Sequence, residues 1–403
     1  MALQKGAPLK PADFDISPDR GFLSPRDPLV TLPSPWPPFL NQLGQTLPKL
    51  LAARQFRGTV NTFRENWARG VGNRDLDELG CAARTLSFAG HGYVWEEPHR
   101  PVARIPAALA VPWCHVMKQL GRPPVLSYAS YALDNWRRLD GSKPIALGNI
   151  ALLQNFFGGL DEEWFVLVHV DIEANAGPAL AGIVQAINSV LADDPDAAAR
   201  GLRDTAAAEE RMYNTLLRMP EGCDPYVYFH RVRPYIHGWK DNPALPQGIV
   251  YEGVEEFHDK PQQFRGETGA QSSIIPSLDA ALGVTHEAGP LTHYLLEMRE
   301  YMPPRHRAFI QTLEDLKDEQ GRPLLFGYVR HWKRNHPALW DAFRECISGL
   351  ARFRETHYDY ADRYIHQQSQ RSLSNPTGVG TGGTPFMTYL KKHLDETLQL
   401  LDA

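Results

Sequence analysis

The stretch 337–367, PALWDAFRECISGLARFRETHYDYADRYIHQ, carries the clearest helical pattern in the chain. Its large apolar and aromatic side chains recur at steps of three and four residues, which places them on one face of a helix. They are Trp340, Phe343, Ile347, Leu350, Phe353, His357, Tyr360 and Tyr364. Pro337 stands in the first turn, where its missing N–H has no intrahelical partner to lose. The stretch predicts one long helix.

His357 lies within this apolar stripe, and an imidazole on such a face needs an explanation. One interpretation is a buried neutral histidine that is hydrogen-bonded to a carbonyl group, and the pattern alone favours it. The other is an axial haem ligand, because a helical histidine that faces an apolar slot is the usual arrangement for such a ligand. The residues of the helix leave both interpretations open.

The composition is that of an ordinary soluble globular protein. The 403 residues are 43% hydrophobic and 22% charged, which excludes disordered, collagen-like and coiled-coil chains and favours two or three domains. A net charge of −5 gives no electrostatic footprint for nucleic acid or an anionic membrane, so a small molecule is the expected partner. The 15 histidines and the many aromatic residues suit a cofactor or an aromatic ligand without requiring either.

The cysteines and the hydropathy pattern point to the cytoplasm. Cys81, Cys114, Cys223 and Cys346 lie far apart and form no CxxC pair, which argues against a disulfide framework or a cysteine zinc site. No stretch reaches the roughly 18 uncharged apolar residues that a membrane helix needs. The N-terminus also lacks a basic region followed by an apolar run. We therefore expect a cytoplasmic protein that is neither exported nor anchored.

The distribution of proline divides the N-terminal part of the chain. Nine of the 33 prolines fall in residues 1–40, too many for a regular element, so this segment is expected to be an extended arm. Residues 41–155 show mostly helical apolar spacing broken by proline-rich joints, and they predict a small helical domain.

Residues 156–403 are expected to form a larger domain. Within it, 195–219 have a strong helical composition with an Asp-rich start. Residues 367–385 are polar, Gly-rich and interrupted by proline, which predicts a mobile loop, and 386–401 return to a helical pattern. No internal repeat is present.

His169 is the second informative histidine. Local propensity makes the run Phe165–Ile172 resemble a strand, whereas Ala174–Leu191 looks helical, so the periodicity is ambiguous. The spacing His169-x-Asp171 is that of two ligands in a facial triad of non-haem iron. That motif is only two residues long, and the sheet that it needs has few other candidate strands. Motifs for zinc peptidases, serine hydrolases, dinucleotide binding and P-loops are absent.

Two further kinds of segment are suggestive. In 226–251, Tyr228, Phe229 and Arg233 offer an aromatic wall and a guanidinium that can hold a carboxylate by two parallel hydrogen bonds. A surface arginine beside core aromatics explains the same pattern. The glycine-containing segments 264–273 and 380–384 are flexible loops by default.

Taken together and in order, these segments resemble the indoleamine 2,3-dioxygenase family, haem enzymes that open the indole ring of tryptophan. The similarity spans roughly residues 20–395 and rests on many short motifs. They are PPVLSYA (123–129), NW (135–136), GWKDNP (238–243), VYEG (250–253), QSS (271–273), YMPP (301–304), His306-Arg307, the His357 helix and GTGGT (380–384).

The resemblance implies an all-α fold in which the small N-terminal helical domain caps the larger, haem-binding one. The run around His169 is then helical, since tertiary context commonly overrides β-branched propensity. His357 matches the proximal, axial ligand of the iron of haem b, and Arg354 and Asp279 match positions near the haem that are expected to pair. The positions that match the substrate pocket are Tyr128, Phe165, Tyr228, Phe229, Arg233, Glu267, Thr268 and Thr381.

The implied activity is insertion of both atoms of O2 across the C2–C3 bond of L-tryptophan on ferrous haem, giving N-formylkynurenine. Arg233 is expected to hold the substrate carboxylate, and Thr381 to close over the amino acid end. We expect a monomer with no nucleic-acid or membrane partner. The alternatives are a haem dioxygenase for another indole and an O2-binding haemoprotein without turnover.

Two positions depart from the mammalian pattern. His169 stands where mammalian members have a small hydroxyl residue, whereas the related tryptophan 2,3-dioxygenases place a histidine in the distal site. A distal imidazole can accept from the indole N–H or donate to oxygen, so His169 is a candidate catalytic residue beside Arg233. Glu267 replaces a glycine and Thr268 a serine, which leaves the identity of the indole open.

Overall fold

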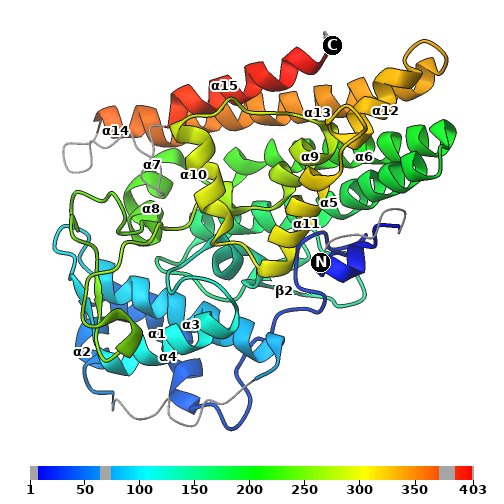
Figure 1. Ribbon diagram of the computed structural model, residues 1–403. Coiled ribbons are helices and arrows are strands. Elements are labelled where there is room, and N and C mark those ends of the chain that lie inside the picture. The colour runs from blue at the N-terminus through cyan, green and yellow to red at the C-terminus, as the bar shows by residue number, and fades with distance from the viewer. Residues whose placement is uncertain (1–7, 64–73, 372–385, 402–403) are drawn as a thin grey trace.

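The structure is a computed structural model that describes residues 8–63, 74–371 and 386–401. Helices dominate these ranges, and the predicted all-α class is confirmed (Figure 1). The named strands form two short pairs. β1 (Arg104–Ile105) pairs in parallel with β4 (Val250–Tyr251), and β2 (Trp136–Arg138) pairs antiparallel with β3 (Ile150–Leu152).

The α-helices that precede the longest one are α1 (Pro38–Ala52), α2 (Phe56–Val60), α3 (Leu76–Trp95) and α4 (Ala107–Gln119). The others are α5 (Leu160–Leu191), α6 (Pro195–Leu216), α7 (Pro225–Val227), α8 (Arg233–Ile236), α9 (Ile274–Leu282), α10 (Pro290–Arg299), α11 (Pro304–Asp315), α12 (Leu324–Trp332), α13 (Pro337–Ala361), α14 (Gln367–Arg371) and α15 (Phe386–Leu398).

Several helices begin where the sequence provides a cap. Asp194 accepts from the N–H of Ala197 at the start of α6, and Pro195 occupies the first helical position. At the start of α13, Nδ1 of His336 accepts from the N–H of Leu339. Such side chains satisfy backbone donors that the first turn of a helix leaves without an intrahelical partner. The helix that was predicted over 195–219 is present as α6, which begins at Pro195 and ends at Leu216.

The long helix predicted over 337–367 is present, with one irregularity. α13 runs to Ala361, a π-helical turn covers Asp362–His366, and α14 continues the path to Arg371. The predicted loop over 367–385 therefore begins too early, because its first residues are helical. The rest of that prediction, residues 372–385, lies outside the described residues.

α5 is a single helix, so the strand-like run around His169 is helical. Its β-branched residues are mostly buried on both sides, and packing of this kind overrides local propensity. α5 lies against α6, and glycines permit a close approach. A Cβ on Gly182 would come within 2.5 Å of the carbonyl oxygen of Gly201.

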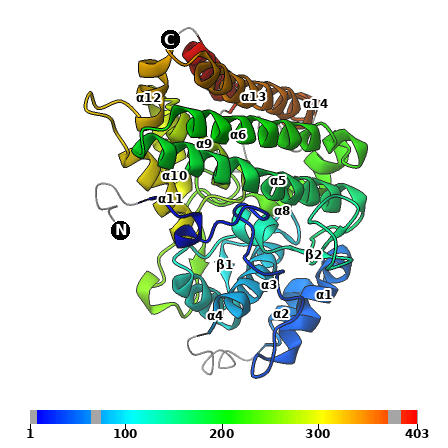
Figure 2. The same cartoon turned by 90° about the vertical axis from the view of Figure 1, so that its right-hand side faces the viewer.

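α13, α6 and α5 follow one another as layers, and the α1–α4 region lies on the far side of α5 (Figure 2). Two hydrophobic clusters fill the molecule, one around α1, α3 and α4 and the other around α6, α9 and α13. α5 contributes to both, since Val166 and Val170 belong to the first and Val168 and Ile172 to the second. The predicted division into domains 41–155 and 156–403 stays a prediction.

The described part of the N-terminal arm follows the surface of α5. The backbone N–H and C=O of Leu9 both hydrogen-bond to the side-chain amide of Asn188, at 2.7 and 2.9 Å. The expectation of no regular element is wrong at Pro11–Phe14, which form a 3₁₀ turn, because proline is well tolerated in the first turn of a helix. α1 also begins within the predicted arm, at Pro38.

The four cysteines are buried and free. Among the residues that the structure describes, no helix combines the length and the apolar character that crossing a membrane requires.

Candidate active site

His357 lies near the end of α13. Its side chain is exposed, and Phe353 and Tyr360 on the same stripe are only half-buried, although the stripe was expected to face the core. Burial nevertheless lowers the pKa of His357 to about 4, assisted by the charges of His169 and Arg354. The ring is therefore surrounded by protein without being packed as a core residue.

His169 on α5 lies close to His357, since its charge influences the pKa of His357. Its Nδ1 lies 2.7 Å from the carbonyl oxygen of Phe165, one turn earlier. A carbonyl oxygen only accepts, so Nδ1 carries the hydrogen in this contact. Burial lowers the pKa of His169, which favours the neutral ring and leaves Nε2 as an acceptor.

Aromatic rings surround His169. The ring of Phe165 lies 4.6 Å from the imidazole and 4.6 Å from the ring of Tyr228, centroid to centroid. Tyr128 approaches the imidazole edge-on at 6.0 Å. Three of the predicted pocket residues, Tyr128, Phe165 and Tyr228, therefore gather near His169.

Arg233 and Phe229 lie on neighbouring turns beyond Tyr228. The π-helical segment Tyr228–Val232 runs directly into α8, and this path puts the guanidinium carbon of Arg233 5.3 Å from the centroid of the Phe229 ring. Both side chains are fully buried. Burial lowers the pKa of Arg233 to about 10, which still leaves it charged at neutral pH. The surface-arginine interpretation is therefore wrong.

Glu267 is held beside α8 by a close backbone contact. Its N–H donates to the carbonyl of Ile236 at 3.1 Å, and the glycines Gly238 and Gly266 pack so closely that a Cβ on either would collide with backbone atoms of the facing segment. The carboxyl group is buried, and its negative charge helps to raise the pKa values of Tyr128 and Tyr228. Burial raises the pKa of Glu267 to about 8.

The structure describes Thr268 but not Thr381. The hydroxyl of Thr268 accepts from the N–H of Ala270 at 3.4 Å, so it caps the 3₁₀ turn Gly269–Gln271. This local role explains a hydroxyl at the position without reference to a ligand. Thr381, with the rest of GTGGT, lies outside the described residues.

Asp279 and Arg354 form the ion pair that was expected. Nη2 of Arg354 donates to Oδ2 of Asp279 at 2.6 Å, and Nη1 donates to the hydroxyl of Thr397 on α15. Burial raises the pKa of Asp279, but Arg354 and His286 outweigh it, and the net shift is downward. Arg354 stands one turn before His357, which places the ion pair close to this histidine.

Sequence reasoning missed Glu173, which lies one turn after His169 on α5. Its carboxylate accepts from the hydroxyl of Ser272 at 2.8 Å and from that of Tyr128. Burial raises its pKa to about 7. The spacing of four residues between His169 and Glu173 was a visible signal, since such residues share a helix face.

The non-haem iron alternative is wrong. His169 and Asp171 stand two apart on a helix, so their side chains point to different sides. Asp171 instead accepts from Asn175 and, across the helix interface, from Thr215 of α6. It takes no part in the site around His169.

The site thus combines a neutral histidine near the end of a long helix, aromatic rings beside a second histidine and a buried ion pair one turn away, and these features fit a helical haem protein. The donor set fits haem, since a neutral imidazole is the form that binds iron and Arg354 is a cation suited to a propionate.

The chain belongs to the indoleamine 2,3-dioxygenase family. The family model "Indoleamine 2,3-dioxygenase" matches residues 10–400. Indoleamine 2,3-dioxygenase 1 of Rattus norvegicus is 35% identical over 96% of this chain and 95% of its own length. The protein of the same name from Mus musculus is 35% identical over 100% and 99%. Membership supports a haem-dependent oxidoreductase that acts on a small molecule.

One relative carries a different name. A protein called myoglobin, from Haliotis madaka, is 30% identical over 97% of this chain and 98% of its own length. The fold is therefore shared by proteins whose names describe different tasks, and the function must be argued from the residues of the site.

Proposed function

We propose that the protein is a haem-dependent dioxygenase that inserts both atoms of O2 across the C2–C3 bond of the indole ring of L-tryptophan and yields N-formylkynurenine. The observation that carries this proposal is the buried guanidinium of Arg233, which lies over the ring of Phe229 and interacts electrostatically with Tyr228. Tyr228 in turn lies against Phe165, the ring that approaches His169. A protein that only stores O2 has no carboxylate to hold. An amino acid with an aromatic side chain needs both a cation for its carboxylate and aromatic rings beside its side chain.

In this proposal His357 would hold the haem iron, and the pair Asp279–Arg354 would support it from one turn away. Haem bound there would supply the iron chemistry that activates O2. The low pKa of His357 keeps its imidazole neutral and ready to ligate at physiological pH.

The substrate is positioned from its two ends. Arg233 holds the carboxylate by charge-assisted hydrogen bonds, while Phe165 and Tyr228 flank the indole. Thr381 closes over the amino acid end in this proposal. Fixing both ends turns an encounter between two molecules into an oriented one, which is where most of the rate enhancement arises.

His169 orients the indole. Because its Nδ1–H is committed to the carbonyl of Phe165, the acceptor Nε2 is available for the indole N–H. The burial that lowers its pKa keeps this acceptor unprotonated at neutral pH. His169 is therefore a hydrogen-bond acceptor in this proposal and not a base that removes the proton.

The test is turnover by the reduced, haem-loaded protein with L-tryptophan in ¹⁸O2-enriched buffer. We expect one N-formylkynurenine for each O2 consumed, with both labelled atoms in the product. Incorporation of a single atom, or none, contradicts the proposal.

Two other functions are favoured by specific observations. The relative named myoglobin favours reversible O2 binding, and O2 uptake without product in the same assay would establish it. Glu267, which is buried close to the tyrosines of the site, favours a different indole. A kcat/KM for a substituted indole well above that for L-tryptophan would establish this second alternative.

A further inference from the structure

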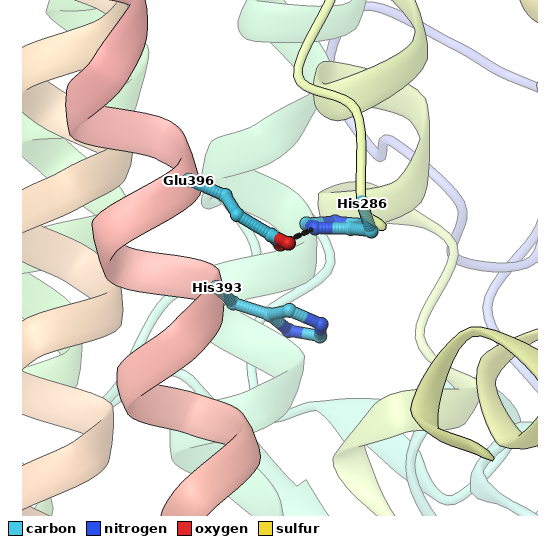
Figure 3. Close-up of side chains that lie close together, drawn as sticks. All are labelled: His286, His393 and Glu396. Carbon is cyan, nitrogen blue, oxygen red and sulfur yellow. Dashed lines mark hydrogen bonds and ion pairs between the residues drawn. The ribbon is translucent and has the colours of Figure 1, made fainter. Parts of the chain in front are cut away.

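We propose a second metal site on the far side of the Asp279–Arg354 pair, formed by His286, His393 and Glu396, which takes a divalent cation of the zinc type. Candidate ligand atoms of these three residues all lie within 4.8 Å of one another. Figure 3 shows the two side chains of α15 on one helix face, turned toward His286 on the connection between α9 and α10.

The helix and the connection each place their ligands for a local reason. His393 and Glu396 are three residues apart on α15, a spacing that puts both on one side of the helix. Gly283 ends α9 with φ +84°, a conformation that favours glycine, and turns the chain toward His286. The site therefore joins two segments that are more than 100 residues apart in the chain.

The three residues already interact. Nδ1 of His286 lies 2.5 Å from Oε2 of Glu396, and the two imidazole centroids are 4.1 Å apart with the rings 33° from parallel. The other carboxylate oxygen of Glu396 accepts from the backbone N–H of Glu287 at 3.1 Å. α15 and the connection between α9 and α10 thus hold two imidazoles and a carboxylate side by side.

His393 gives an independent reason to expect a ligand. Its Nε2 is buried and has no hydrogen-bond partner in the structure. A buried imidazole nitrogen without a partner is costly, and a metal ion would use its lone pair. Two histidines and one carboxylate with a water in the fourth position are a common coordination of zinc.

Asp279 provides the outer support that such sites use. Its Oδ2 lies 3.3 Å from Nε2 of His286, so a metal on Nδ1 leaves Nε2–H to donate to a carboxylate. The same oxygen accepts from Arg354. The proposed metal is thereby connected through two hydrogen bonds to the helix turn that precedes His357.

Binding requires small movements of side chains. Metal–ligand bonds of about 2.0–2.2 Å in a tetrahedron separate ligand atoms by roughly 3.3 Å, so the His286–Glu396 contact opens and one ring turns toward the other. Lys392 lies 3.7 Å from Oε1 of Glu396 and 2.8 Å from Oε2 of Glu287. It is partly exposed and retains Glu287 as its partner when the metal takes Glu396.

The test is a Zn²⁺ titration of the haem-loaded protein, stripped with a chelator and dialysed, in competition with a chromophoric chelator. We expect one tight equivalent of Zn²⁺ and none of Mg²⁺, which prefers oxygen ligands. His393→Ala and Glu396→Gln should each weaken that equivalent by about 100-fold or more, and Asp279→Asn by about 10–100-fold. His115→Ala, at an exposed histidine of α4, is the matched control and should change nothing.

The Soret band and the far-UV circular dichroism of each variant report folding. If His393→Ala does not fold, His286→Asn removes a ligand from the connection without touching α15. A wild-type protein that takes up no tight equivalent of Zn²⁺ overturns the proposal. So does an equivalent that survives unchanged in both ligand variants.

Discussion

Nη2 of Arg354 donates to Oδ2 of Asp279 at 2.6 Å, and this bond ties α13 to α9 three residues before His357. The side chains of Arg354 and Asp279 are 8% and 12% exposed, so their opposite charges attract each other where little water screens them. Removing one partner of such a pair leaves the other charged and uncompensated. The position of His357 thus depends on a contact between segments 75 residues apart.

Asp279→Ala is therefore expected to destabilise the protein by about 3–5 kcal/mol, the range for a broken buried pair. The measurement is urea unfolding followed by circular dichroism. Arg352→Ala is the matched control on the same helix, because Arg352 pairs with Glu210 at the surface and such pairs contribute about 0–1 kcal/mol. Equal losses in the two variants would contradict a buried role for Asp279.

His357→Ala is expected to abolish the Soret band of the purified protein, because the residue proposed to hold the haem iron is removed. His366→Ala is the control. His366 follows on the same helical path, and its Nε2 lies 2.9 Å from the amide nitrogen of Gln370. Its variant should keep full haem content by the pyridine haemochrome assay. A His357 variant that retains wild-type haem would exclude this residue as the ligand.

The period of three and four residues predicted α13 correctly, but it could not tell which part of the apolar stripe is packed in the core and which part stays uncovered. His357, Phe353 and Tyr360 share the apolar stripe with Leu350, and only the packing of other elements leaves the first three partly uncovered. The ambiguity at His169 has a similar origin. Its β-branched neighbours are helical because α5 is buried between two clusters, which local propensity does not record.

Contacts between residues far apart in the sequence could not be predicted without the family resemblance. Asp279 and Arg354 were expected to pair only because the resemblance placed both near the haem. His286 and Glu396 are 110 residues apart and belong to no motif, so nothing in the sequence indicated that they meet. Glu173 could have been predicted more easily, because its spacing from His169 places the two on one helix face. That prediction required α5 to be recognised as a helix first.

Arg233→Leu is expected to raise KM for L-tryptophan by about 100-fold, the equivalent of roughly 3 kcal/mol for a charge-assisted contact. The binding of tryptamine, which lacks the carboxylate, should change much less. The readout is steady-state kinetics for L-tryptophan and ligand-induced haem spectral shifts for both compounds. Arg231→Leu is the control, because Arg231 is exposed and lies over the ring of Phe157. Equal weakening of both compounds in the Arg233 variant would refute a carboxylate contact.

Glu267→Gln is expected to alter the pH dependence of both stability and substrate binding. Burial raises the pKa of Glu267 to about 8, well above its ordinary value of 4.5. The folded state therefore holds a proton that the unfolded state releases between these two values, and stability falls as the pH rises through that window. The slope from this group is at most about 1.4 kcal/mol per pH unit.

Glutamine carries no such proton, so the difference in unfolding free energy between the variant and the wild type should grow from pH 5 to about 8 and then level off. If Glu267 contacts the substrate ammonium, KM of the wild type for L-tryptophan should also fall as the carboxyl ionises toward about pH 8, and the variant should lose this dependence. Glu345→Gln, at an exposed position of α13, should follow the wild type in both measurements. A flat stability difference would show that Glu267 is already ionised in the folded protein at pH 5, and the ammonium contact would then have to be judged from KM alone.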